Sequence, residues 1–134
     1  MAPLPPRILL IDDDRALRDV VAKSLVYAGH TVTHAEDGLQ GIELARAAPF
    51  DLVVTDLVMP VKEGLETILA LRQEFPAVPV IAISGGVNNS TIYLDVAAKI
   101  GAKRILEKPF TPGELINLIA QVLRETDRGE PARE

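Results

Sequence analysis

The chain has 134 residues, the commonest size for a single domain, and carries a net charge of −5 at pH 7. This negative charge argues against a general nucleic-acid surface, and the absence of cysteine excludes disulfides, thiol catalysis and cysteine-ligated metals. Hydrophobic residues make up 48% of the chain but aromatic residues only 4%, so we expect an aliphatic core, as in helices packed on a parallel sheet.

Five short apolar segments alternate along the chain with longer amphipathic segments, a pattern typical of a βα-repeating fold. The short segments, for example residues 8–11 and 80–83, are apolar without alternation, as expected for strands covered on both faces. We therefore predict strands at residues 7–11, 31–35, 51–55, 78–83 and 103–106.

The amphipathic segments predict five helices. The first has its apolar residues at helical spacing: Leu17, Val20, Val21 and Leu25. We expect this apolar face to contact the sheet, and the helix to end before Gly29. Three further helices are predicted at residues 37–47, 63–74 and 89–100.

The last helix begins at a capping box, in which Thr111 and Glu114 stand three residues apart with Pro112 at the first helical position. Its periodic apolar residues are Leu115, Leu118, Ile119 and Val122. The apolar period is lost beyond Arg124. We therefore predict a flexible tail at residues 1–6, one domain at residues 7–124 and a disordered tail at residues 125–134.

Right-handed crossovers between these elements predict an α/β fold, a doubly wound five-stranded parallel sheet of order 2-1-3-4-5 in a three-layer sandwich. In this order the first and third strands are neighbours at the switch point of the sheet. Ligands bind there, beyond the carboxyl ends of the strands. The residues that follow each strand are therefore the candidates for a functional site.

The candidate side chains for a site follow the first, third, fourth and fifth predicted strands. These residues are Asp12, Asp13 and Asp14 after the first strand, Asp56 after the third, Ser84 after the fourth and Lys108 after the fifth. Parallel strands bring these residues to one end of the sheet, where carboxylates repel one another unless a cation neutralises them. Magnesium is the favoured candidate, because it accepts a few carboxylates and completes its coordination with water and phosphoryl oxygens.

Taken one at a time, these residues have ordinary explanations. A lone aspartate after a strand most often caps a helix or lies in solvent, and we assign Asp14 to that role. Lys108 facing an acidic cluster, however, would stabilise a phosphoryl oxygen electrostatically. Ser84 precedes two glycines, so its loop can approach a ligand closely and can move.

The combined motifs resemble the receiver domain of two-component response regulators, in particular the single-domain, chemotaxis-regulator-like members. The motifs are Asp12-Asp13, Asp56-Leu57-Val58-Met59-Pro60 with Gly64, Ser84-Gly85 and Lys108-Pro109-Phe110, and the resemblance covers about residues 7–124. It implies a flavodoxin-like fold and transfer of a phosphoryl group from the phosphohistidine of a histidine kinase to Asp56.

The resemblance also implies a role for each matching residue. Asp13, Asp56 and the backbone carbonyl of Val58 would ligate Mg²⁺ directly, and Asp12 would act mainly through water. Lys108 would hold the acyl phosphate and Ser84 would bond a phosphoryl oxygen. A cis peptide would precede Pro109.

For the whole chain the resemblance implies a stand-alone, cytoplasmic response regulator that is not an enzyme beyond promoting its own phosphorylation and dephosphorylation. Its partners would be a sensor histidine kinase or phosphotransfer protein and a downstream protein. The latter would bind the face formed by the fourth helix, fifth strand and fifth helix. We expect no nucleic-acid or membrane partner, because the chain is acidic and has no apolar run of spanning length. A monomer or weak dimer is expected.

Three positions depart from the family pattern or tune it. Ile105 stands where members often carry Tyr or Phe, which argues against an aromatic rotamer relay. Val58 and Gly86 stand where the family varies its dephosphorylation rate, and neither has a polar side chain to align water. We therefore expect a long-lived phosphoryl group.

Three alternatives share parts of this pattern. A haloacid-dehalogenase-like phosphatase also has Asp-x-Asp after its first strand, but Arg15 is atypical there and no later acidic pair follows a strand. A pseudo-receiver that binds partners without phosphorylation has the same fold, although the intact polar set argues against it. A flavin-binding module would have a Ser/Thr/Gly phosphate loop in place of the acids.

Overall fold

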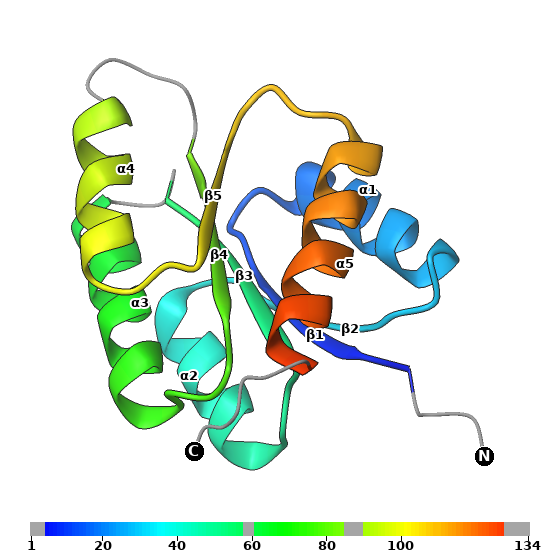
Figure 1. Ribbon diagram of the computed structural model, residues 1–134, viewed down its shortest axis with the longest axis horizontal. Helices are drawn as coiled ribbons and strands as arrows, with labels where there is room; N and C mark the ends of the chain where they lie inside the picture. Colours follow the sequence, from blue (N-terminus) through cyan, green and yellow to red (C-terminus); the bar gives the residue numbers. More distant parts are fainter. Residues whose placement is uncertain (1–4, 58–60, 85–89, 128–134) are drawn as a thin grey trace.

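The computed structural model describes residues 5–57, 61–84 and 90–127. Its five strands form one parallel sheet in the order β2-β1-β3-β4-β5 (Figure 1), which confirms the predicted α/β topology. The strands are β1 (Arg7–Ile11), β2 (Thr31–Ala35), β3 (Leu52–Asp56), β4 (Val80–Ser84) and β5 (Arg104–Glu107).

Five helices cover the two faces of the sheet. They are α1 (Arg15–Tyr27), α2 (Gly38–Ala47), α3 (Val61–Glu74), α4 (Ser90–Lys99) and α5 (Pro112–Asp127). Helices α1 and α5 lie on one face, and α2, α3 and α4 lie on the other (Figure 1). No helix among the described residues is long and apolar enough to cross a membrane.

The core is divided into two parts by the sheet, because successive strand side chains point to opposite faces. In β1, Ile8 and Leu10 pack toward α1 and α5, whereas Leu9 and Ile11 pack toward α2 and α3. All four side chains are almost completely buried. This explains why the strand is apolar without alternation.

Strands β1 and β2 have the predicted bounds, and the later strands are displaced by one or two residues. Strand β4 begins at Val80, since Pro79 has no N–H group to contribute to the sheet. Strand β3 ends at Asp56 instead of one residue before it. Asp56 is therefore part of the sheet, at the carboxyl end of its central strand.

The predicted apolar face of α1 is partly wrong. Val21 and Leu25 are buried, but Val20 is 54% exposed. The buried face instead includes Arg18, which is 7% exposed and lies three residues before Val21. The side chain of Leu17 lies outside the part of the chain that the structure describes.

Helix α5 confirms its predicted start and corrects its predicted end. The Glu114 N–H donates to Thr111 Oγ1 (3.1 Å), and the Thr111 N–H donates to Glu114 Oε1 (2.7 Å), as a capping box requires. The helix continues to Asp127, three residues beyond Arg124. Arg104 on β5 contacts Glu125 at 2.6 Å, and this ion pair belongs to a stretch that we had assigned to the disordered tail.

Candidate functional site

Asp56 is the last residue of the central strand β3 and is 1% exposed. Its strand pairs with β1 on one side and β4 on the other. The N–H of the next residue, Leu57, donates to the Ile83 carbonyl oxygen (2.7 Å), so hydrogen bonding between β3 and β4 continues one residue beyond Asp56. Strand β3 is thus held on both sides up to Thr55, and Asp56 itself pairs with Ile83 of β4.

Lys108, just after β5, reaches across the sheet edge to Asp56. Its Nζ lies 2.9 Å from Asp56 Oδ2, a contact that combines a hydrogen bond with an ion pair. The Lys108 side chain is 22% exposed, whereas the carboxylate is buried. The Lys108–Pro109 peptide is cis, as the sequence resemblance implied. The buried Asp56 carboxylate is therefore paired with a partly exposed ammonium group.

Asp12 follows β1 and is 2% exposed. Burial, with a smaller contribution from the neighbouring Asp56 carboxylate, raises its pKa from 3.8 to about 7. The Asp14 N–H, which donates to Asp12 Oδ1 at 2.8 Å, and the Lys108 ammonium act in the opposite direction. A side-chain hydrogen bond between Asp12 and Asp56 also raises the pKa of Asp12. The Lys108 ammonium alone therefore does not offset the burial of the Asp12 carboxylate and its repulsion by Asp56.

Arg18 is a residue that sequence reasoning missed. Its Nη1 donates to the Asp12 carbonyl oxygen at 3.3 Å, so this buried guanidinium holds the backbone of the β1–α1 loop. Its spacing from Val21 and Leu25 placed it on the apolar face, but a charged residue is not expected there. The helical spacing of Arg18 from Val21 and Leu25 was the only sequence signal for its burial.

The structure brings together part of the predicted set. Asp12, Asp56 and Lys108 meet at the sheet edge, whereas the Asp13 side chain is exposed. Asp14 is also exposed, and its carbonyl accepts from the Arg18 N–H (2.9 Å) in the first turn of α1. Val58, Gly86 and the side chain of Ser84 lie outside the described residues, although the Ser84 backbone ends β4.

The described residues contain no group of three or more Asp, Glu or His side chains already arranged to hold a metal ion. Two neighbouring buried carboxylates, of which Asp12 has a raised pKa, are nevertheless suited to a divalent cation, because its charge would offset their burial and repulsion. Their oxygen ligands are of the kind that Mg²⁺ prefers. The donor set therefore fits magnesium, and the predicted ligands stay a prediction.

The family model described as the response regulator receiver domain matches residues 8–120. Among curated proteins, the chain is 35% identical over 129 residues to "Response regulator MprA" from Mycobacterium sp. (strain KMS), covering 95% of this chain and 54% of that protein. A similar match, 34% over 128 residues and 54% of the protein, is found with MprA from Mycobacterium leprae. The chain thus spans about half the length of these relatives.

Solved structures show the same fold. A CheY-like response regulator receiver domain protein from Methanospirillum hungatei is similar with a TM-score of 0.85 and 26% identity, over 92% of this chain and 98% of that one. The chemotaxis response regulator CheY4 of Vibrio cholerae gives a TM-score of 0.79 and 29% identity, over 88% and 98%. Sequence motifs, site geometry and all three comparisons agree that this chain belongs to the receiver domain family of response regulators.

Proposed function

We propose that Asp56 accepts a phosphoryl group, with Mg²⁺, from the phosphohistidine of a sensor histidine kinase or a phosphotransfer protein. The observation that carries this proposal is the buried Asp56 carboxylate with Lys108 Nζ at 2.9 Å and the buried Asp12 beside it. Transfer to a carboxylate requires positively charged groups close to the carboxylate oxygens and to the oxygens of the incoming phosphoryl group. Lys108 supplies part of that charge.

In the transfer, an Asp56 carboxylate oxygen forms a bond to phosphorus while the phosphorus–nitrogen bond of the phosphohistidine breaks. The leaving imidazole keeps the electron pair of that bond and takes up a proton. Lys108 then neutralises an oxygen of the acyl phosphate. The Ser84 hydroxyl donates to another phosphoryl oxygen. Each of these roles is electrostatic or positional, as is usual for phosphoryl transfer.

The residues proposed to hold magnesium are Asp12, Asp13, Asp56 and the backbone carbonyl of Val58. When bound, the ion supplies positive charge at the phosphoryl oxygens. Arg18 supports this arrangement indirectly, since it fixes the Asp12 carbonyl oxygen and hence the loop that carries both acids. Asp13 is exposed directly after Asp12 in the chain, and we propose that its carboxylate turns toward the ion.

The proposed output is a phosphorylation-dependent change on the face formed by α4, β5 and α5, which would bind a downstream protein. Ile105 on β5 takes the place of the aromatic residue that often relays the change. We propose that the protein acts in the cytoplasm, as a monomer or weak dimer, and turns over no other substrate. Because neither Val58 nor Gly86 has a polar side chain to align an attacking water, we expect the phosphoryl group to be long-lived.

The test is the intact mass of the protein after incubation with acetyl phosphate, with and without Mg²⁺. We expect a magnesium-dependent gain of one phosphoryl group in the wild type and none in Asp56→Asn. Asp19→Asn, a change at an exposed position on α1, is the matched control and should behave like the wild type.

No gain in the correctly folded wild type would contradict the proposal and favour an interaction module that works without phosphorylation. Hydrolysis of a phosphomonoester that is abolished by Asp12→Asn and retained by Asp56→Asn would instead indicate a phosphatase with Asp12 as its nucleophile.

A further inference from the structure

An apolar pocket lies at the end of the sheet opposite to Asp56. Its volume is about 280 Å³, and its floor consists of Val53, Leu71 and Val80, which are buried. Val53 is the second residue of β3 and precedes Asp56 by three residues, which corresponds to roughly 10 Å along the strand. The pocket is therefore separate from the candidate phosphoryl site.

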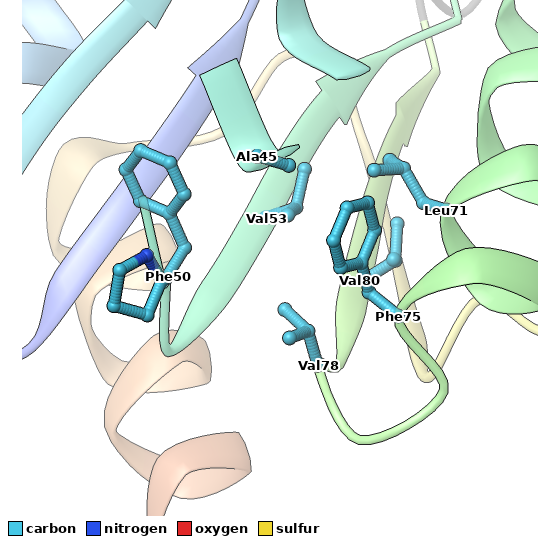
Figure 2. Close-up of a pocket in the computed structure, with 8 residues that line it drawn as sticks. Ala45, Phe50, Val53, Leu71, Phe75, Val78 and Val80 are labelled. Atoms are coloured by element: carbon cyan, nitrogen blue, oxygen red, sulfur yellow. The ribbon is translucent and has the colours of Figure 1, made fainter. Parts of the chain in front are cut away.

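Two phenylalanine rings form the sides of this pocket. Figure 2 shows Phe50 and Phe75 on opposite sides, with Val53 between them and Val78 at the lower edge. The Arg7 guanidinium lies 5.1 Å from the centroid of the Phe50 ring and so holds that ring in place. Phe75 and Val78 are only partly buried, so a ligand can enter without unfolding of the core.

Several backbone polar groups around the pocket are already paired within the protein. Arg72 Nη1 donates to the carbonyl oxygens of Pro76 (2.8 Å) and Val78 (3.2 Å). The Val78 N–H donates to the Phe75 carbonyl oxygen (3.0 Å), and the Val53 N–H donates to the Pro79 carbonyl oxygen (3.0 Å). A ligand would therefore meet carbon atoms, and a charged or strongly polar ligand would lose its hydration without compensation.

The width of the pocket depends on the separation between the ends of α2 and α3. Arg46 and Glu74 join these ends by two contacts, Nε to Oε2 at 2.6 Å and Nη2 to Oε1 at 2.9 Å. Each residue is the chain neighbour of a lining residue, Ala45 or Phe75. A bidentate contact of this kind fixes the relative position of the two helix ends.

We propose that this pocket binds a small uncharged apolar molecule of about the size of a two-ring aromatic compound. An engineered apolar cavity of roughly 150 Å³ stays dry and binds benzene, and the present volume of about 280 Å³ is nearly twice that. The floor of aliphatic side chains and the two facing rings match the flat shape and apolar surface of such a ligand. The ligand class follows from volume, lining and paired polar groups together.

The test is a titration with naphthalene, followed by carbon–proton NMR of the valine and leucine methyl groups. Saturable shifts are expected at Val53, Leu71, Val78 and Val80, and the charged 1-naphthoate should bind at least tenfold more weakly. Ala45→Leu places extra carbon atoms in the pocket and should abolish the shifts. Ala47→Leu is an exposed change of the same size on α2 and should leave them intact.

If Ala45→Leu does not fold, Val78→Phe serves as a second filling variant with the same expected loss. The proposal is overturned if the wild type shows no saturable shifts, or if the shifts persist in a folded filling variant. Self-association of the wild type that Ala45→Leu abolishes, without naphthalene binding, would assign the pocket to a second copy of the chain and would also overturn it.

Discussion

Replacing Asp12 with Asn should make the metal-free protein more stable at high pH. Burial, with a further contribution from Asp56, raises the pKa of Asp12 from 3.8 to about 7. Each pKa unit corresponds to about 1.4 kcal/mol, so ionised Asp12 destabilises the folded state by about 4 kcal/mol. Because the folded state holds the proton more tightly, stability is retained below pH 3.8 and is lost as the pH rises through about 7.

Asparagine removes this loss and keeps the local geometry. Its side-chain oxygen can still accept from the Asp14 N–H, which lies 2.8 Å from Asp12 Oδ1. Its amide can donate to Asp56, as the protonated Asp12 carboxyl does. The stabilisation by Asp12→Asn should therefore be small near pH 4 and should grow to about 4 kcal/mol at pH 8.

The measurement is urea unfolding followed by circular dichroism from pH 4 to pH 8, with a chelator present to remove divalent ions. Asp13→Asn is the control, since it removes an exposed carboxylate from the same loop. Added Mg²⁺ should stabilise the wild type more than Asp12→Asn, because the ion offsets the same charge. A stability difference that does not change with pH, or a wild type that is the more stable protein at pH 8, would refute the reasoning.

Two further predictions concern the helices. Thr111→Ala removes the acceptor of the Glu114 N–H and should cost about 1 kcal/mol in urea unfolding, with Thr111→Ser close to the wild type; equal losses in both variants would rule out capping as the cause. Gly41→Ala would place its Cβ against the Ile11 side chain and should destabilise by about 1–3 kcal/mol. Gly113→Ala, whose Cβ meets only Thr111 Oγ1 at 3.8 Å, should be neutral or stabilising, and a loss as large as that of Gly41→Ala would contradict the packing argument.

Sequence reasoning succeeded where one local signal decides the structure. The apolar run of β1 allowed only a strand covered on both faces, and the Thr111–Glu114 spacing predicted a capping box that the structure contains. The same reasoning failed where a distant partner decides. Glu125 lies in a polar stretch without apolar period, yet α5 continues through it, and Arg104 on another element pairs with it.

Charge on an apolar face was the second source of error. Val20 was assigned to the buried face of α1 because it is hydrophobic, and Arg18 was left out because it is charged. In the structure Val20 is exposed and Arg18 is buried. A buried guanidinium is favourable only when an acceptor is within reach, and here the acceptor is the Asp12 carbonyl oxygen in the preceding loop. The position of that oxygen is a property of the folded loop.

The sequence by itself determined the α/β topology and the acids, serine and lysine that follow the strands, because parallel strands have all their carboxyl ends at one end of the sheet. Only the tertiary structure decided how these residues are used. It buried Asp12 beside Asp56, placed Lys108 Nζ 2.9 Å from the Asp56 carboxylate and left Asp13 exposed. It also formed the apolar pocket between Phe50 and Phe75, since packing gaps depend on side chains from several elements at once.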